Sequence, residues 1–218
     1  MAHISIKIRK ETIDDYKAVE HITREAFWNL FVPGCDEHYL CHILRDSTCF
    51  IPELDYVAEA DGRIVGNIIY SKAKVIGDNG EEHLVIMFGP IAVLPEYQHL
   101  GIGSKLIEHT KQKARQLGYT AILIYGDPKY YEKVGFVPAE NYDIATADNK
   151  YHEALQAYEL IDGALQSVRG RFVENKIFDI NMEAAMEFDK GFEPKKHIKG
   201  LPSQIRFQEV NAMIKSRK

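Results

Sequence analysis

The chain has 218 residues, of which 45% are hydrophobic and 27% charged, a composition typical of a globular protein with one domain plus an extension, or of two small units. Its net charge of −5 argues against a dedicated nucleic-acid-binding protein, which would carry a basic stripe. No stretch is long enough to span a bilayer and the amino terminus lacks a signal-peptide pattern, so we expect a cytoplasmic protein with no membrane partner.

From its start the chain predicts a strand, two helices and an antiparallel pair of strands. The ranges expected for these elements are 4–8, 12–28, 36–45, 54–60 and 63–76. The first helix begins near cap candidates such as Thr12 and carries apolar residues at helical spacing. Pro33 and Gly34 end it, and Asp61-Gly62 supplies the tight turn between the two strands.

The region of the second helix contains four side chains of metal-ligating type, which are Cys35, His38, Cys41 and His42. On a helix, positions 35, 38 and 42 share one face and position 41 lies beside 38. Four ligands on one helix cannot easily close a tetrahedron, since structural zinc sites draw ligand pairs from separate elements. We therefore expect no metal site and interpret these residues as small packing groups and surface imidazoles. With Cys49 the cysteine count is odd and gives no disulfide framework.

The most informative feature is a glycine-rich turn between a strand and a helix. An apolar stretch over 84–93 is expected as a buried strand, and helical periodicity after the turn continues to Gly118. The turn and the first helical residues leave backbone N–H groups free, and the helix dipole adds positive charge there. A pyrophosphate fits such a site, and glycines at 101 and 103 let it approach the backbone. Basic residues of the helix, among them Lys111, are expected on its solvated face.

A second strand–turn–helix unit follows directly. Residues 121–125 are expected as a buried strand, and Asp127-Pro128 then starts a short helix with Asp as its N-cap. Gly135 ends that helix and Phe136 begins another strand. Two further strands are expected over 153–161 and 163–175, paired through a turn at 162–163.

Two common phosphate-binding motifs do not fit the glycine-rich turn. The dinucleotide fingerprint would need a third glycine where Leu106 stands, and no Lys-Ser or Lys-Thr pair follows as a P-loop requires. What stands there is Q-x-x-G-x-G at 98–103, after a strand ending V-x-P, followed by Y-x-x-x-G-F at 131–136. This pair of motifs resembles the coenzyme A loop and the second hallmark of the GCN5-related N-acetyltransferase (GNAT) superfamily. The resemblance covers about residues 4–176, with its specific motifs confined to 88–136.

The resemblance implies an α/β (α+β) fold with a central mixed, largely antiparallel twisted sheet flanked by helices. It implies that a bulge at 88–90 splays the strand from its neighbour, and that the backbone after it contacts the pantetheine arm of acetyl-CoA. Tyr131 is implied as the general acid that protonates the leaving thiolate, with Tyr130 as its neighbouring competitor. The coenzyme-binding residues implied are Ile91, Ala92, Val93, Gln98, His99, Leu100, Gly101, Ile102, Gly103, Ser104, Tyr130 and Tyr131.

The general base is left open by the sequence. Family members often carry a glutamate on the strand before the loop, and residues 84–93 contain no carboxylate. Asp127 could serve through a water molecule, and Glu37 and His38 on the second helix are other options. The pattern does not decide among them.

The last part of the chain carries no catalytic motif. We expect a GNAT acyl-CoA-binding domain over 1–176 and a helical or irregular extension over 177–218, with helices at 181–189 and 204–214. A basic cluster at 195–199 could contact the coenzyme's ribose phosphate or form a solvated face, of which we favour the solvated face.

The activity implied is transfer of an acetyl group from acetyl-CoA to a primary amine, by direct attack in a ternary complex and without a metal. A non-catalytic acyl-CoA-binding module, or an acyltransferase using a longer acyl-CoA, is the alternative. The expected partners are acetyl-CoA and an amine that the sequence does not identify; a homodimer stays open.

Overall fold

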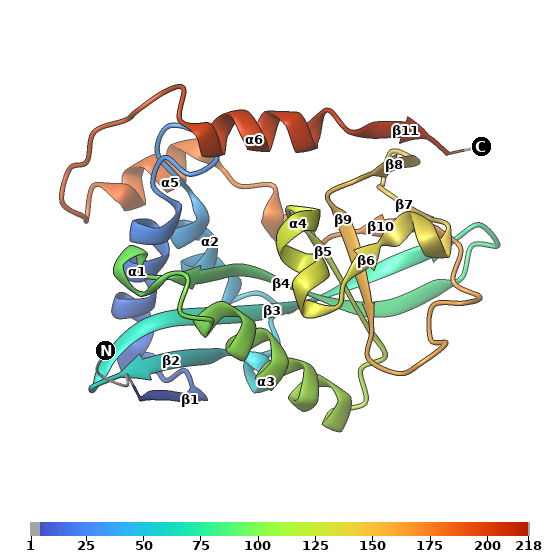
Figure 1. Ribbon diagram of the computed structural model, residues 1–218, viewed down its shortest axis with the longest axis horizontal. Helices are drawn as coiled ribbons and strands as arrows, with labels where there is room; N and C mark the ends of the chain where they lie inside the picture. Colours follow the sequence, from blue (N-terminus) through green and yellow to red (C-terminus); the bar gives the residue numbers. More distant parts are fainter. Residues whose placement is uncertain (1–4, 218) are drawn as a thin grey trace.

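The computed structural model describes residues 5–217 (Figure 1); residues 1–4, where the expected first strand begins, lie outside them. Within 5–217 nine strands form one sheet, in the order β1-β2-β3-β4-β5-β9-β6, with β10 on β3 and β7 on β10. The strands are β1 Ile6–Lys10, β2 Tyr56–Ala60, β3 Arg63–Gly77, β4 Glu82–Val93, β5 Ala121–Tyr125, β6 Val137–Pro138, β7 Ile144–Ala145, β9 Leu155–Glu159 and β10 Gly170–Val173. A separate two-stranded ribbon pairs β8, Lys150–His152, with β11, Ile214–Ser216.

Six α-helices surround this sheet in the described part of the chain. Their bounds are α1 Tyr16–Phe27, α2 Glu37–Leu44, α3 Ile102–Gln116, α4 Pro128–Tyr131, α5 Met182–Asp189 and α6 Pro202–Asn211. Short 3-10 turns cover Ile13–Asp15, Pro52–Leu54, Pro95–Tyr97, Glu132–Val134, Ala139–Tyr142 and Lys176–Phe178. Helix α3 packs on one face of the sheet, and α1 and α2 pack on the other (Figure 1).

The sheet is mixed and mostly antiparallel, which confirms the predicted fold class. Strands β1 to β4 pair antiparallel in chain order, whereas β4 and β5 pair parallel at Ile86 and Ile122. The register of β4 against β3 shifts between the pairs Ile68–Ile91 and Tyr70–Phe88, so β4 carries one extra residue. The bulge expected at 88–90 is therefore confirmed. Beyond Ile86 the described pairing of β4 is with β3, so β4 and β5 separate there and a cleft opens between them.

Helix α3 packs on the sheet through an apolar stripe that includes Ile102, Leu106 and Ile107. The expectation that Lys111 is solvated is wrong, because its side chain is 1% exposed. Its ammonium donates to the Val134 carbonyl and, at 2.8 Å, to Glu108, and it lies 3.7 Å from the centre of the Tyr158 ring. A long aliphatic stem with three satisfied contacts at its tip lets this lysine enter the core.

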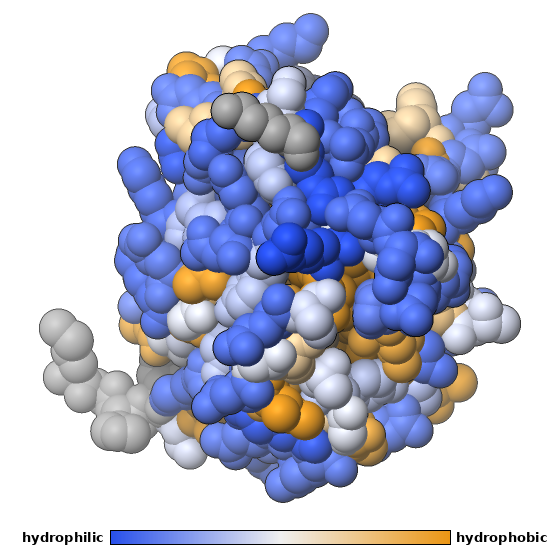
Figure 2. Space-filling model, turned by 90° about the vertical axis from the view of Figure 1, so that its right-hand side faces the viewer, coloured by the Kyte–Doolittle hydropathy of each residue, from blue (hydrophilic) through white to orange (hydrophobic). Residues whose placement is uncertain are grey.

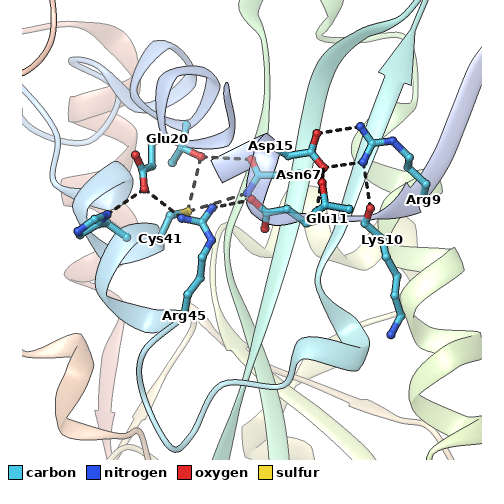
Figure 3. A network of polar contacts seen from close by, with 11 residues as sticks. Arg9, Lys10, Glu11, Asp15, Glu20, Cys41, Arg45 and Asn67 are labelled. Atoms are coloured by element: carbon cyan, nitrogen blue, oxygen red, sulfur yellow. Dashed lines mark hydrogen bonds and ion pairs between the residues drawn. The ribbon is translucent and has the colours of Figure 1, made fainter. Parts of the chain in front are cut away.

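A buried polar network ties α1 and α2 to β1 (Figure 3). The Arg45 guanidinium donates to Glu11 at 2.7 Å and to Glu20 at 3.1 Å, and its side chain is 4% exposed. Glu20 also bonds His42 at 3.0 Å. Burial, reinforced by Glu11, raises the pKa of Asp55 well above its usual range. The network fixes the two helices that form one wall of the cleft.

The strand expected over 163–175 is shorter and pairs elsewhere, so that prediction is wrong in part. Residues 163–167 form turns, and β10 pairs antiparallel with the far end of β3, at Lys74–Gly77 in register with Gly170–Val173. The reason is that β3 extends well past the end of β2 and leaves an edge free there, while β9 pairs with β5 on one side and β6 on the other.

Residues 196–217, which we call the C-terminal strap, cross the top of the molecule from α1 and α2 to β8 (Figure 1). At one end the Lys196 carbonyl accepts from Trp28 at 3.0 Å and from Asn29 at 2.9 Å. At the other, β11 pairs with β8 and Arg217 contacts Asp78 at 2.5 Å. The face at that end is mostly hydrophilic (Figure 2). The expected helix at 204–214 is thus α6 followed by a strand that the sequence did not predict.

Candidate functional site

A cavity of about 940 Å³ opens where β4 and β5 separate. Its walls come from α1 and the loop after it, α2, the bulged part of β4, the loop before α3, α4 and the segment after β10. The described lining includes Phe27, Leu30, Phe31, Glu37, Leu40, Met87–Ile91, Val93, Tyr97–His99, Gly101–Ser104, Tyr125–Asp127, Tyr130, Tyr131, Glu174 and Phe178. Sequence motifs that lie far apart in the chain therefore meet in one space.

The glycine-rich turn forms one end of this cavity. Gly101 is the N-cap of α3 with φ +78°, a left-handed conformation that favours glycine, and a Cβ there would project into open space. The first helical bond runs from Lys105 N to the Gly101 carbonyl at 3.0 Å, so the preceding N–H groups have no partner within the helix. The Gln98 amide donates to the Val93 carbonyl at 3.0 Å and holds the loop against the end of β4. The arrangement can accept an anion at the N-terminus of α3.

Two residues of the predicted coenzyme set do not line the cavity with their side chains. Ala92 is 2% exposed in the core, and Leu100 is 51% exposed on the outside of the turn. Both remain neighbours of lining residues through the backbone, so their coenzyme contacts stay predictions.

The two adjacent tyrosines have different surroundings. Tyr131 lies in an aromatic pocket, 6.0 Å from Phe88 and 5.6 Å from Phe136 between ring centres, and its ring covers Gly126 so closely that a Cβ there would overlap it. Burial raises the pKa of Tyr131, so its hydroxyl stays protonated at neutral pH. The Tyr130 hydroxyl instead lies over Gly103, where a Cβ would be 2.7 Å away. Tyr131 is thus the tyrosine held in the apolar part of the cleft.

Asp127 is occupied by other contacts. It accepts from Arg206 of α6 at 2.8 and 3.0 Å, and from the backbone of Lys129 at 3.0 Å as N-cap of α4. The Arg206 guanidinium lowers the pKa of Asp127, with burial acting in the opposite direction. A carboxylate held in this way is a weak proton acceptor, which disfavours the predicted base role.

Two other carboxylates enter the cavity. Burial raises the pKa of Glu37 to about 7, with Asp36 as a further cause. Burial raises the pKa of Glu174 to about 7 as well, with Asp179 as a further cause. A carboxyl group with this pKa can exchange a proton near neutrality. Glu37 was one of the options from sequence, whereas Glu174 was missed, because nothing local distinguishes it from the other glutamates of the chain.

His38 is buried, so its interpretation as a surface imidazole is wrong. The ring packs against Phe188 and Phe192, and its Nε2 lies 3.1 Å from Asp189. Burial lowers the pKa of His38 to about 4, and burial raises the pKa of the neighbouring Cys35 thiol. Neither residue is among those that line the cavity, so the structure gives neither a catalytic position there.

Across residues 5–217, no helix is long and apolar enough to cross a membrane. The same residues show no group of three or more histidine, cysteine, aspartate or glutamate side chains placed to hold a metal ion.

Comparison with known proteins agrees with this geometry. A family model described as an acetyltransferase (GNAT) domain matches residues 49–138. The chain is 28% identical to the Escherichia coli uncharacterized N-acetyltransferase YhbS over 164 residues, which are 75% of this chain and 92% of YhbS. It is 33% identical to E. coli YjhQ, also an uncharacterized N-acetyltransferase, over 87 residues, 40% of this chain and about half (48%) of YjhQ.

Solved structures give the same result. The crystal structure of E. coli YhbS in complex with CoA superposes with a TM-score of 0.73 at 26% identity, covering 83% of this chain and 95% of that one. A GNAT-family acetyltransferase from Brucella melitensis in complex with acetyl-CoA superposes with a TM-score of 0.64 at 26% identity, covering 81% of this chain and 100% of that one.

Proposed function

Because the chain belongs to the GCN5-related N-acetyltransferase superfamily, we propose that it transfers an acetyl group from acetyl-CoA to a primary amine. The observation that carries the proposal is the free N-terminus of α3, which opens into the same cavity as Tyr131. The pyrophosphate would lie on the N–H groups of the turn. The pantetheine arm would follow the edge of β4 at 91–93, beyond the point where β5 leaves it. The crystal structures of YhbS with CoA and of the Brucella protein with acetyl-CoA support this assignment.

The proposed reaction is direct attack in a ternary complex. The amine first loses a proton to Glu37 or Glu174, whose raised pKa suits a general base near neutral pH. Its nitrogen then bonds to the thioester carbonyl carbon, and a backbone N–H in the bulged part of β4 would stabilise the oxyanion. When the carbon–sulfur bond breaks, Tyr131 donates its proton to the thiolate. The nitrogen then gives up its second proton, which reprotonates Tyr131. The products are an amide and coenzyme A.

Two alternatives are less well supported. A non-catalytic acyl-CoA-binding module was suggested by the lack of a carboxylate over residues 84–93, and the two cavity carboxylates remove that reason. A longer acyl chain would have to pass Phe88, which is 4% exposed and packs 6.0 Å from Tyr131. We therefore favour the short acetyl group.

Calorimetric titration with acetyl-CoA, and in parallel with NAD and ATP, tests the coenzyme. We expect saturable binding of acetyl-CoA alone, and its absence would contradict the proposal. Release of coenzyme A in the presence of amines tests the chemistry. Tyr131→Phe should lower kcat by about 100-fold with little change in acetyl-CoA affinity. The rise of kcat with pH near 7 should be lost in Glu37→Gln or Glu174→Gln, whichever is the base; if both variants keep it, the base lies elsewhere.

A further inference from the structure

The part of the cavity away from the glycine-rich turn has a distinct lining. We call it the acceptor chamber and define it by Leu30, Phe31, Glu37, Leu40, Glu174 and Phe178. Four of these side chains are apolar and two are carboxylates. The apolar walls would exclude water from the apolar part of a bound acceptor, and the two carboxylates favour a positive charge on its polar group.

The charges in the chamber favour a single cation. Among the described residues that line the whole cavity there is no lysine or arginine, and the Asp127 carboxylate is already paired with Arg206. Burial raises the pKa of both Glu37 and Glu174, and no guanidinium or ammonium of residues 5–217 acts on either carboxylate to lower it. Burial is the largest cause of a raised pKa at Tyr125 too, and Glu174 adds to it, so Glu174 lies near Tyr125 at the end of β5. An ammonium group that binds either carboxylate would lie in the same cavity as Tyr131.

Helix α6 crosses the top of the molecule (Figure 1) and joins two sides of the cavity through its contacts with Asp127 and Phe31. Its Arg206 binds Asp127, which belongs to the wall formed by β5 and α4. The next residue, Phe207, stacks on Phe31 of the opposite wall, with ring centres 4.9 Å apart. Gln204 donates to the Asn29 carbonyl at 3.0 Å beside it. A polypeptide lying across the cleft would meet this helix, whereas a small molecule fits beneath it.

We propose that the acceptor is a small primary amine with one positive charge and an apolar body about the size of one aromatic ring. The inference rests on the proposed acetyl transfer and deepens it by naming the substrate class. The acceptor must be small because one cavity of about 940 Å³ has to hold the pantetheine arm as well. Polyamines and polar amino sugars would leave charges or hydroxyls unpaired against Leu30, Phe31, Leu40 and Phe178.

The test compares four acceptors at a fixed, saturating acetyl-CoA concentration. They are 2-phenylethylamine, ethanolamine, spermidine and an N-terminally blocked peptide with one lysine. We expect kcat/KM for 2-phenylethylamine to exceed that for each of the others by at least about 10-fold, since an aromatic ring in an apolar pocket adds more than one methylene group. Equal rates, or preference for ethanolamine, spermidine or the peptide, would overturn the inference while leaving acetyl transfer intact.

A variant pair tests the chamber itself. Leu30→Asn should reduce the preference for 2-phenylethylamine over ethanolamine by about 10-fold through KM. Leu117→Asn, at a leucine on the far end of α3 that is 47% exposed, should leave the preference unchanged. Titration of 2-phenylethylamine into the protein saturated with coenzyme A gives an independent readout. Absence of saturable binding there overturns the substrate class, whereas absence of acetyl-CoA binding in the earlier titration overturns the proposed function itself.

Discussion

Replacing Gly101 by alanine should weaken acetyl-CoA binding strongly while lowering the stability of the fold only slightly. At φ +78° an alanine costs roughly 1 kcal/mol of backbone strain, and its Cβ meets no protein atom within 4 Å. In a chain of this size that strain lowers Tm by about 2–4 °C. The same Cβ would occupy the space through which phosphates approach the free N–H groups at the start of α3. Losing one or two charge-assisted hydrogen bonds costs about 2–4 kcal/mol, which is a rise in the Kd for acetyl-CoA of about 30- to 1,000-fold.

Gly118→Ala is the matched control, because Gly118 lies just past the other end of α3 with φ +85° and also has nothing within 4 Å. Both variants should lose similar thermal stability, measured by calorimetry or dye-based melting. In isothermal titration only Gly101→Ala should lose affinity for acetyl-CoA. A folded Gly101→Ala protein that binds acetyl-CoA within about twofold of the wild type would refute the assignment of the loop.

Three further predictions concern buried charge and the strap. Lys111→Ala should lower the free energy of unfolding by about 2 kcal/mol in urea titrations, since it leaves the Val134 carbonyl unpaired and a void beside Tyr158; an unchanged midpoint would contradict this. Burial raises the pKa of Glu37 in the folded protein to about 7 from an ordinary value of 4.5, so the folded protein binds more protons and its stability should fall as pH rises from 4.5 through 7. Glu37→Gln should flatten this dependence of stability on pH, so that the variant loses less stability than the wild type between pH 5 and pH 8. An unaltered slope would contradict the prediction. Arg206→Ala should change the global stability little, because the ion pair with Asp127 is partly exposed, but it should speed amide exchange in α6; unchanged exchange would show that the pair does not hold the helix.

The parts of this protein that its sequence predicts are those with local causes. The loop before α3 and the start of α4 follow from Gly101, Asp127 and Pro128, each of which acts on its own few neighbours. By contrast, the burial of Lys111 depends on Val134 and Tyr158, which reach it only when α3, the turn before β6 and β9 come together. No periodicity rule contains that information.

The same distinction applies within the site. Tyr131 could be singled out from sequence because a motif surrounds it, although its catalytic role stays a prediction. Glu174 could not, since it enters the cavity only because β10 pairs with the far end of β3 rather than with β9. Asp127 was a reasonable base candidate until its partner was known, and that partner, Arg206, is 79 residues away in the chain.

The way the C-terminal strap is attached also has a consequence for its motion. Its contacts join residues far apart in the chain, such as Gln204 with Asn29, 175 positions away, and Arg217 with Asp78, 139 positions away. It is attached largely by polar contacts, and Ile205 and Met213 within it are 51% and 42% exposed. A segment held in this way detaches at a lower free energy than the sheet beneath it, so we expect α6 to lift while β1 to β5 stay folded. Product release, which follows the chemical step, would then depend on how often α6 lifts.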